Sequence, residues 1–285
     1  MNWKFLPLVI SVLVAAPYQA ARGEVIEDVR YGPSCNPRTH YCGLIIKLQG
    51  EITVADYEKA KRLIDQTHRQ AESKNWAWDG IVVYLDTPGG NVDAAMAIGR
   101  LLRKEQAIAH IGYMPLHTQG ICYSACVLVL AGAVNRQMQD GKVGIHRPYY
   151  EVPKDKVSPD KISELYQKML QDIRAYFHEM NVSEQLADAM LRINPENMRL
   201  LNNAELNNYG LTYEDPIARE TEELKIAQQL GLSRQEYMRR KILAKSRCGG
   251  EISSKCYQHI IDTGQVSMQP PTPEELAPDF TMYGR

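Results

Sequence analysis

Hydrophobic and polar positions in the first half of the chain alternate between strand-like and helix-like patterns. Residues 42–53 (CGLIIKLQGEIT) are apolar and rich in β-branched side chains, which predicts a buried strand. Residues 54–73 carry apolar side chains at helical spacing, and residues 80–90 (GIVVYLDTPGG) return to a strand that stops at Pro-Gly-Gly. These three segments predict a β-α-β unit.

The same alternation continues downstream. The pattern predicts a helix over 92–104, a strand over 107–114, a helix over 124–133 and a short strand over 141–148. Strands separated by helices of this length favour a parallel sheet with helices packed outside it, so the fold class is α/β.

The remaining segments differ in character. Residues 158–180 open on a Ser-Pro helix cap and predict a long helix, a shorter helix follows over 183–193, and residues 216–247 predict charge-rich helices. Residues 24–42 contain glycine and prolines and predict an irregular arm. The tail after Cys256 contains QPPTPEE, which predicts an extended, mobile segment.

The first 23 residues indicate export. A short positive start, MNWK, precedes the apolar run FLPLVISVLVAAP, and small residues fit a signal-peptide cleavage site before Glu24. An uncleaved membrane anchor is the alternative, although the apolar run is short for a membrane span. We therefore expect a mature protein in the periplasm or outside the cell.

Composition narrows the classes of function. Lys+Arg total 33 against Asp+Glu 34, and the basic residues are spread along the chain rather than grouped, so we expect no nucleic-acid partner. The six cysteines fall into three local pairs: Cys35 with Cys42, Cys122 with Cys126, and Cys248 with Cys256. Six cysteines allow 15 connectivities; short loops favour the two outer pairs as disulfides, while the middle pair is either bridged or buried as free thiols. The spacing does not favour a metal site.

Three segments supply the ingredients of acyl transfer. Ser124 lies where a loop meets an apolar helix, so it is a candidate nucleophile, and the Ala125 N–H is a candidate oxyanion donor. Gly89 and Gly90 in TPGGN end a strand and offer a second donor with close backbone approach. His146 follows the last strand of the α/β region and is the candidate base. Each has an ordinary alternative: a helix N-cap, a turn, and a hydrogen-bonded histidine.

The segments LDTPGGNVDAAMAI, GICYSACVLVLAGA and VGIHRP, taken in this order, resemble the proteolytic subunit of Clp protease, and NNAELNNYGL is similar to the end of that family's core. The resemblance covers residues 43–215 and implies a ClpP/crotonase-like fold of repeated ββα units. Residues 216–285 lie beyond it, and their own pattern predicts a helical C-terminal extension with a mobile tail. It also implies a serine peptidase that needs no cofactor, acts on polypeptide and forms homo-oligomers.

The chain departs from the family at the third member of the triad. The position where the family carries an aspartate falls on Asn194, although a one-residue shift or another acid, Asp188 or Glu196, is also open. An asparagine can orient an imidazole but adds no negative charge to stabilise imidazolium.

Two further departures concern the setting. The cysteines on either side of Ser124 replace small or apolar residues, and a bridge between them would make the loop rigid and pre-organise the nucleophile. An exported protein meets no ATP pool, so we expect ATP-independent cleavage of unfolded or membrane-proximal polypeptide. The alternatives are a non-catalytic interaction protein on the same scaffold and a coenzyme A enzyme of the same superfamily.

Overall fold

The computed structural model describes residues 24–27, 35, 40–112, 120–138, 141–149, 158–211, 213–248 and 254–266. The predicted signal peptide, residues 1–23, lies outside these residues. None of the helices within the described ranges has the length and apolar character needed to cross a membrane.

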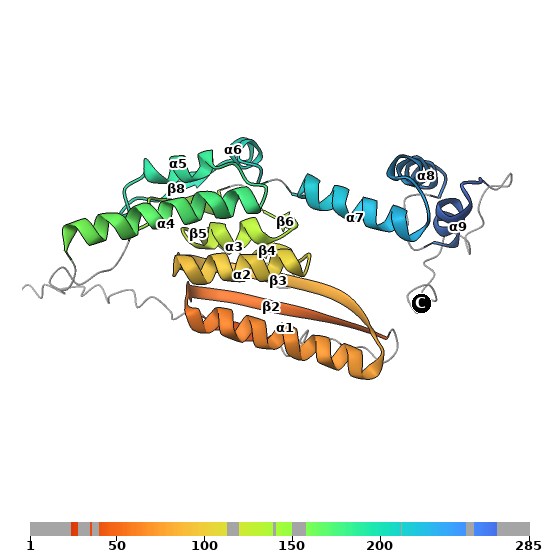
Figure 1. The fold of residues 1–285 in the computed structure, drawn as a ribbon, viewed down its shortest axis with the longest axis horizontal. Coiled ribbons are helices and arrows are strands. Elements are labelled where there is room, and N and C mark those ends of the chain that lie inside the picture. The colour runs from red at the N-terminus through yellow and green to blue at the C-terminus, as the bar shows by residue number, and fades with distance from the viewer. Residues whose placement is uncertain are drawn as a thin grey trace, which may run out of the picture.

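The predicted strands and helices of the first half are present, and they form one mixed sheet with helices packed against it (Figure 1). The elements of the α/β part, in chain order, are β1 (Glu24–Glu27), β2 (Tyr41–Ile52), α1 (Val54–Lys74), β3 (Ala77–Gly90), α2 (Val92–Lys104), β4 (Ile108–Ile111), β5 (Cys122–Tyr123), α3 (Cys126–Gly132), β6 (Asn135–Gln137) and β7 (Val143–Ile145).

The sheet has the strand order β1-β2-β3-β5-β7-β8. Off this path, β4 pairs with β3, and β6 pairs with β4. Strands β2 to β7 pair in parallel, as the helix-strand alternation predicts, whereas β1 and β8 are antiparallel edge strands. The expectation of an irregular arm is therefore wrong for residues 24–27, which pair with residues 46–49 of β2.

The alternating burial of residues along the long strands shows which face of the sheet packs against the core. Leu44, Ile46 and Leu48 of β2 are buried, while the residues between them are only partly buried. This period of two places one row of side chains toward the helices. Helix α3 lies deepest, because each of its seven residues is buried.

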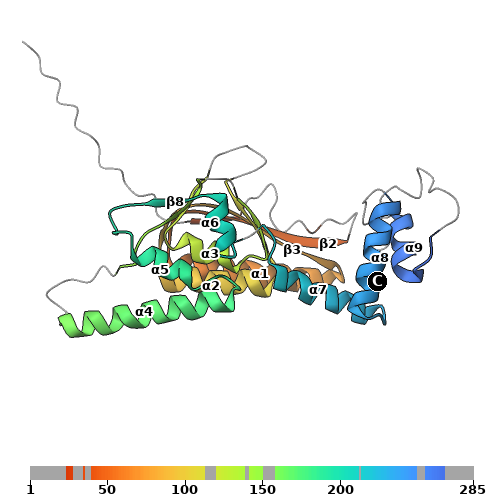
Figure 2. The same ribbon diagram turned by 90° about the horizontal axis from the view of Figure 1, so that it is seen from above.

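The second half is helical, as predicted. It comprises α4 (Pro159–Glu179), α5 (Gln185–Leu191), the short strand β8 (Arg199–Leu201), α6 (Asn203–Asn208), α7 (Pro216–Gln229), α8 (Arg234–Arg247) and α9 (Lys255–Thr263). Ser158 accepts a hydrogen bond from the Lys161 N–H and Pro159 opens α4, as the Ser-Pro pair predicts. Helix α4 projects beyond the sheet (Figure 2).

Helices α7 to α9 form a C-terminal unit beside the α/β body (Figure 1). Their buried side chains form a second hydrophobic cluster, separate from the main core, and a disulfide joins Cys248 to Cys256. The expectation that the chain is extended after Cys256 is wrong as far as Thr263. Ser254 caps α9, and Tyr257, Ile260 and Ile261 bury one face of the helix. Residues 267–285 lie outside the described residues.

Candidate active site

The candidate site is built at the ends of three neighbouring parallel strands. Thr87 of β3 pairs with Cys122 of β5, and Cys122 pairs with Val143 of β7. The carboxyl ends of parallel strands meet at the same edge of a sheet. Gly89, Ser124 and His146 follow these pairs within a few residues, so the structure brings the three predicted segments to one edge.

Ser124 adopts an unusual backbone conformation. Its φ is 55°, in the left-handed region that a serine rarely occupies, and its N–H donates to the Gly144 carbonyl at 2.9 Å. Ala125 occupies the N-cap position of α3 without a side-chain cap, and within the described residues Ser124 Oγ has no hydrogen-bond partner. The hydroxyl is therefore not used as a helix cap, and the ordinary interpretation of Ser124 does not hold.

Gly89 is the glycine that approaches the serine. A Cβ built on Gly89 would lie 2.6 Å from Ser124 Cβ and 3.1 Å from the Ala125 nitrogen. Gly89 also has a φ of +114°, so both space and backbone conformation require glycine there. Gly90 has a different neighbour, because its Cβ would lie 2.4 Å from the Ile52 carbonyl oxygen on β2.

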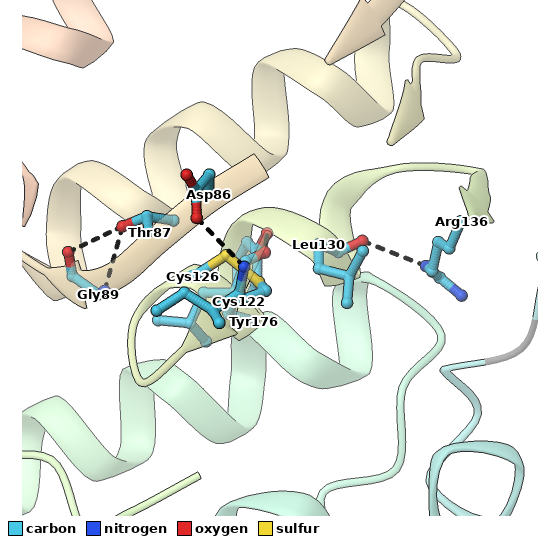
Figure 3. The surroundings of a disulfide bond; sticks show 10 residues. Asp86, Thr87, Gly89, Cys122, Cys126, Leu130, Arg136 and Tyr176 are labelled. Atoms are coloured by element: carbon cyan, nitrogen blue, oxygen red, sulfur yellow. Dashed lines mark hydrogen bonds between the residues drawn. A yellow bond between two sulfur atoms is a disulfide. The ribbon is translucent and has the colours of Figure 1, made fainter. Parts of the chain in front are cut away.

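The two predicted oxyanion donors beside Ser124 differ in availability. The Gly89 N–H donates to Thr87 Oγ1 at 3.1 Å, and that hydroxyl is 3.2 Å from the Gly89 carbonyl oxygen (Figure 3). In the part of the chain that the structure describes, the Ala125 N–H donates to no acceptor. Ala125 is therefore the donor that an oxyanion beside Ser124 could use directly.

His146 is held in one tautomer by the residue that follows it. His146 is 7% exposed, and its Nδ1 lies 2.9 Å from the Arg147 carbonyl oxygen. A carbonyl oxygen can only accept, so Nδ1 carries the proton and Nε2 is left as the basic nitrogen. The Tyr149 ring packs at 5.9 Å between centroids. Ser124 and His146, both described, are not joined by a hydrogen bond in this structure.

Asn194 is linked to Arg147 rather than directly to His146. Arg147 Nη2 donates to Asn194 Oδ1 at 3.3 Å, and the Arg147 N–H donates to the Ile193 carbonyl at 2.9 Å. Of the alternative acids, Asp188 pairs with Arg174 at 2.8 Å, and Glu196 is exposed. The assignment of Asn194 to the site stays a prediction.

A disulfide spans the serine. Cys122, in β5, is bonded to Cys126, the first residue of α3; both are fully buried and their Cα atoms are 5.1 Å apart. Asp86 accepts a hydrogen bond from the Ile121 N–H just before this bridge (Figure 3). The open question of the middle cysteine pair is therefore settled as a bridge, and the two outer pairs are bonded as predicted.

Sequence reasoning missed Thr87 and Arg147. Thr87 stands inside the TPGGN segment, and its hydroxyl is positioned to cap the glycine turn, so the signal was present. Arg147 acts through its backbone carbonyl, which no side-chain pattern reveals. Within the described ranges, no group of three His, Cys, Asp or Glu side chains could hold a metal ion.

Comparison with known proteins decides the family. A family model described as Clp protease matches residues 43–221, more than half of the chain. The chain belongs to the Clp protease family. The recognition made from the glycine turn, the serine segment and the Ile-His-Arg-Pro segment is confirmed, and so is the ClpP-like α/β fold with a helical C-terminal part.

Solved structures of two proteases are similar to this member of the Clp protease family. A point mutant of 1510-N, a membrane-bound stomatin-specific protease, has 24% identity and a TM-score of 0.40, covering 60% of this chain and 76% of its own. A point mutant of ClpP1 from Listeria monocytogenes has 15% identity and a TM-score of 0.42, covering 64% of this chain and 95% of its own. The curated proteins contain no match to the chain.

Proposed function

We propose that this Clp protease family member is an exported, ATP-independent serine peptidase with Ser124 as nucleophile and His146 as general base. The observation that carries the proposal is the meeting of Gly89, Ser124 and His146 at one sheet edge, with Ser124 in a left-handed conformation beside an unused Ala125 N–H. Strained, non-glycine backbone of this kind is concentrated at functional sites.

The chemistry follows from the roles of these atoms. Ser124 Oγ attacks the carbonyl carbon of the scissile peptide bond while His146 Nε2 accepts the Oγ proton. The resulting oxyanion accepts a hydrogen bond from the Ala125 N–H. When the tetrahedral intermediate collapses, the C–N bond breaks and His146 returns the proton to the leaving amine. Water then attacks the acyl-serine with His146 again as base, which releases the acid and restores the hydroxyl.

The base is oriented by a neutral group. The Arg147 carbonyl fixes the Nδ1–H tautomer of His146 but supplies no full negative charge to the imidazolium that forms. Among the described residues, the Asn194 side chain is hydrogen-bonded to this arrangement only through the Arg147 guanidinium. We therefore place the pair Ser124–His146 at the centre of the proposal, with Asn194 as a supporting residue.

The setting of the protein is part of the proposal. Three disulfides suit an oxidising compartment, and the N-terminal 23 residues have the composition of a signal peptide. Members of the family act on peptides and form homo-oligomers. We propose an unfolded or membrane-proximal polypeptide as the substrate, in the periplasm or outside the cell.

The test is covalent labelling of the purified mature protein with a fluorophosphonate probe. Wild type should be labelled, and Ser124→Ala and His146→Ala should abolish labelling while their circular dichroism spectra stay native. Labelling that survives in folded Ser124→Ala would overturn the assignment of the nucleophile, and folded wild type that never reacts would overturn the peptidase.

The second candidate is a non-catalytic interaction protein on the same scaffold. Two observations favour it: Ser124 and His146 are not hydrogen-bonded, and Asn194 stands where an acid is expected. Catalytic hydrogen bonds are often long or unformed before substrate binds, which is why the peptidase is preferred. A folded wild type that resists labelling would favour this candidate.

A further inference from the structure

One buried carboxylate, Asp215, lies where the C-terminal helices meet the α/β body. It is 1% exposed, and its Oδ1 accepts hydrogen bonds from the Ile217 and Ala218 N–H groups at 2.9 and 3.0 Å. These bonds satisfy two of the free N–H groups at the start of α7. The Asp215 N–H also donates to the Val134 carbonyl at 2.8 Å, so the first turn of α7 is fixed to the body.

The other oxygen of Asp215 faces two arginines that hold helix α3. Arg103 Nη1 donates to Asp215 Oδ2 at 2.7 Å, and Arg136 Nη2 is 3.7 Å from the same oxygen. Arg103 Nη2 also donates to the Ala131 carbonyl at 3.3 Å, and Arg136 donates to the Leu130 and Ala131 carbonyls at 3.2 and 2.9 Å (Figure 3 shows the Leu130 bond). These carbonyls lie in the last turn of α3, the helix that follows Ser124.

The opposite charges of this buried cluster stabilise one another. Arg136 is fully buried, and burial lowers its pKa to about 10 while Asp215 acts in the opposite direction. Burial alone would raise the pKa of Asp215, but hydrogen bonds from the Ala218 N–H, Arg103 and Asn181 outweigh it and hold the pKa below its ordinary value. Removing one member of a buried charge cluster leaves the others uncompensated.

Helix α3 is short and tightly packed, so a displacement of its last turn would also displace Ser124. A Cβ on Gly132 would lie 2.2 Å from the Gly99 carbonyl oxygen of α2, and Tyr176 of α4 donates to the Leu128 carbonyl at 2.6 Å. At its other end the Cys122–Cys126 bridge ties α3 to β5. Displacing a catalytic group by about 1 Å can slow a reaction about 100-fold.

We propose that Asp215 is a positioning residue that couples the C-terminal helix α7 to the nucleophile, because one carboxylate caps α7 and anchors the two arginines that hold the last turn of α3. This inference rests on the proposed function of Ser124. It assigns helix α7 a role in setting the reactivity of the site, although this helix lies away from the strand ends that form it.

The test measures fluorophosphonate labelling kinetics of the full chain, separated into the maximal rate kinact and the probe affinity KI. Asp215→Asn keeps a good N-cap of the same size but removes the charge. Arg103→Gln leaves the α7 cap in place and removes one of the two arginine links between Asp215 and the Ala131 carbonyl. In both variants we expect kinact to fall at least about tenfold while KI changes little, the signature of a misplaced nucleophile.

The matched control is Ser233→Ala, which removes the N-cap of the neighbouring helix α8, where Ser233 Oγ accepts from the Glu236 N–H at 3.1 Å. It should lower the melting temperature without changing kinact. Two results would overturn the inference: wild-type kinact in both folded variants of the Asp215 cluster, or an equal loss of kinact in Ser233→Ala. Absence of labelling in wild type would instead refute the proposed function, so the two failures are distinguishable.

Discussion

The disulfide around Ser124 can be removed to measure what it contributes to the reactivity of this proposed nucleophile. Cys122 and Cys126 are both fully buried, so a reductant would reach the bridge slowly and incompletely. The double variant Cys122→Ala/Cys126→Ala removes it cleanly. Alanine suits both positions because it is compatible with the helix start at Cys126 and small enough for the core.

The expected loss follows from the length of the closed loop. For a sequence separation of 4, loop-closure entropy gives a stabilisation of about 2 kcal/mol. The left-handed conformation of Ser124, at φ 55°, costs roughly 1–2 kcal/mol, so the two terms are of similar size. If the whole of the bridge's contribution acted on the turn, the ratio of correctly placed to displaced Ser124 would fall about 30-fold. Core packing around the turn still helps to hold Ser124 in place when the bridge is removed, so we expect the labelling rate to decrease between about 3-fold and 30-fold.

The assay is the rate of fluorophosphonate labelling, with the melting temperature measured in parallel. The matched control is Cys248→Ala/Cys256→Ala, which removes the bridge between α8 and α9, a longer loop with a sequence separation of 8. This control should lose stability but label at the wild-type rate. Wild-type labelling by a folded Cys122→Ala/Cys126→Ala variant would refute the claim that the bridge pre-organises Ser124.

Three further predictions follow from single residues. Gly89→Ala should abolish labelling because the added Cβ would clash with Ser124. The control Gly80→Ala, at φ +90° with no atom within 4 Å of the added Cβ, should lose stability only. Equal labelling of the two variants would contradict this prediction. Asn194→Ala should slow labelling less than about tenfold, because among the described residues this side chain hydrogen-bonds only to Arg147, whereas His146→Ala should abolish labelling. Equal losses in the two variants would support a triad that includes Asn194. The pKa of Asp215 is lowered in the folded state, so its contribution to the free energy of unfolding is present above the unfolded pKa and is lost as pH falls through the folded pKa. Chemical unfolding measured from neutral to acid pH should therefore show a shallower decline in the free energy of unfolding for Asp215→Asn than for wild type.

The sequence predicted the long elements of the fold because each buries a full apolar face. β2, β3, α1 and α2 are long enough for a period of two or 3.6 residues to be visible. The short strands β1, β5, β6 and β8 have two to four residues each, and so few positions show no period. Their pairing depends on where the rest of the sheet places them.

The site was predictable in its parts but not in its connections. The residue types and order made Ser124, His146 and the glycine turn candidates for the site, and short loops predicted the outer disulfides. The sequence could not show that Gly89 rather than Gly90 faces the serine, since adjacent glycines are equivalent until the strands are paired. It also could not show that Arg147 orients His146, because a backbone carbonyl is present at every position.

These connections together explain how a site with a neutral orienting group could still be reactive. A carboxylate beside the histidine would stabilise the imidazolium by charge, and here a carbonyl takes that position. The remaining sources of rate are position and oxyanion stabilisation, and both depend on the β5–α3 turn. That turn is fixed by the Cys122–Cys126 bridge at one end of α3 and by the arginines held by Asp215 at the other. Variants that loosen either end should therefore cost more activity than variants of Asn194, and the opposite ranking would show that charge, not geometry, activates the serine.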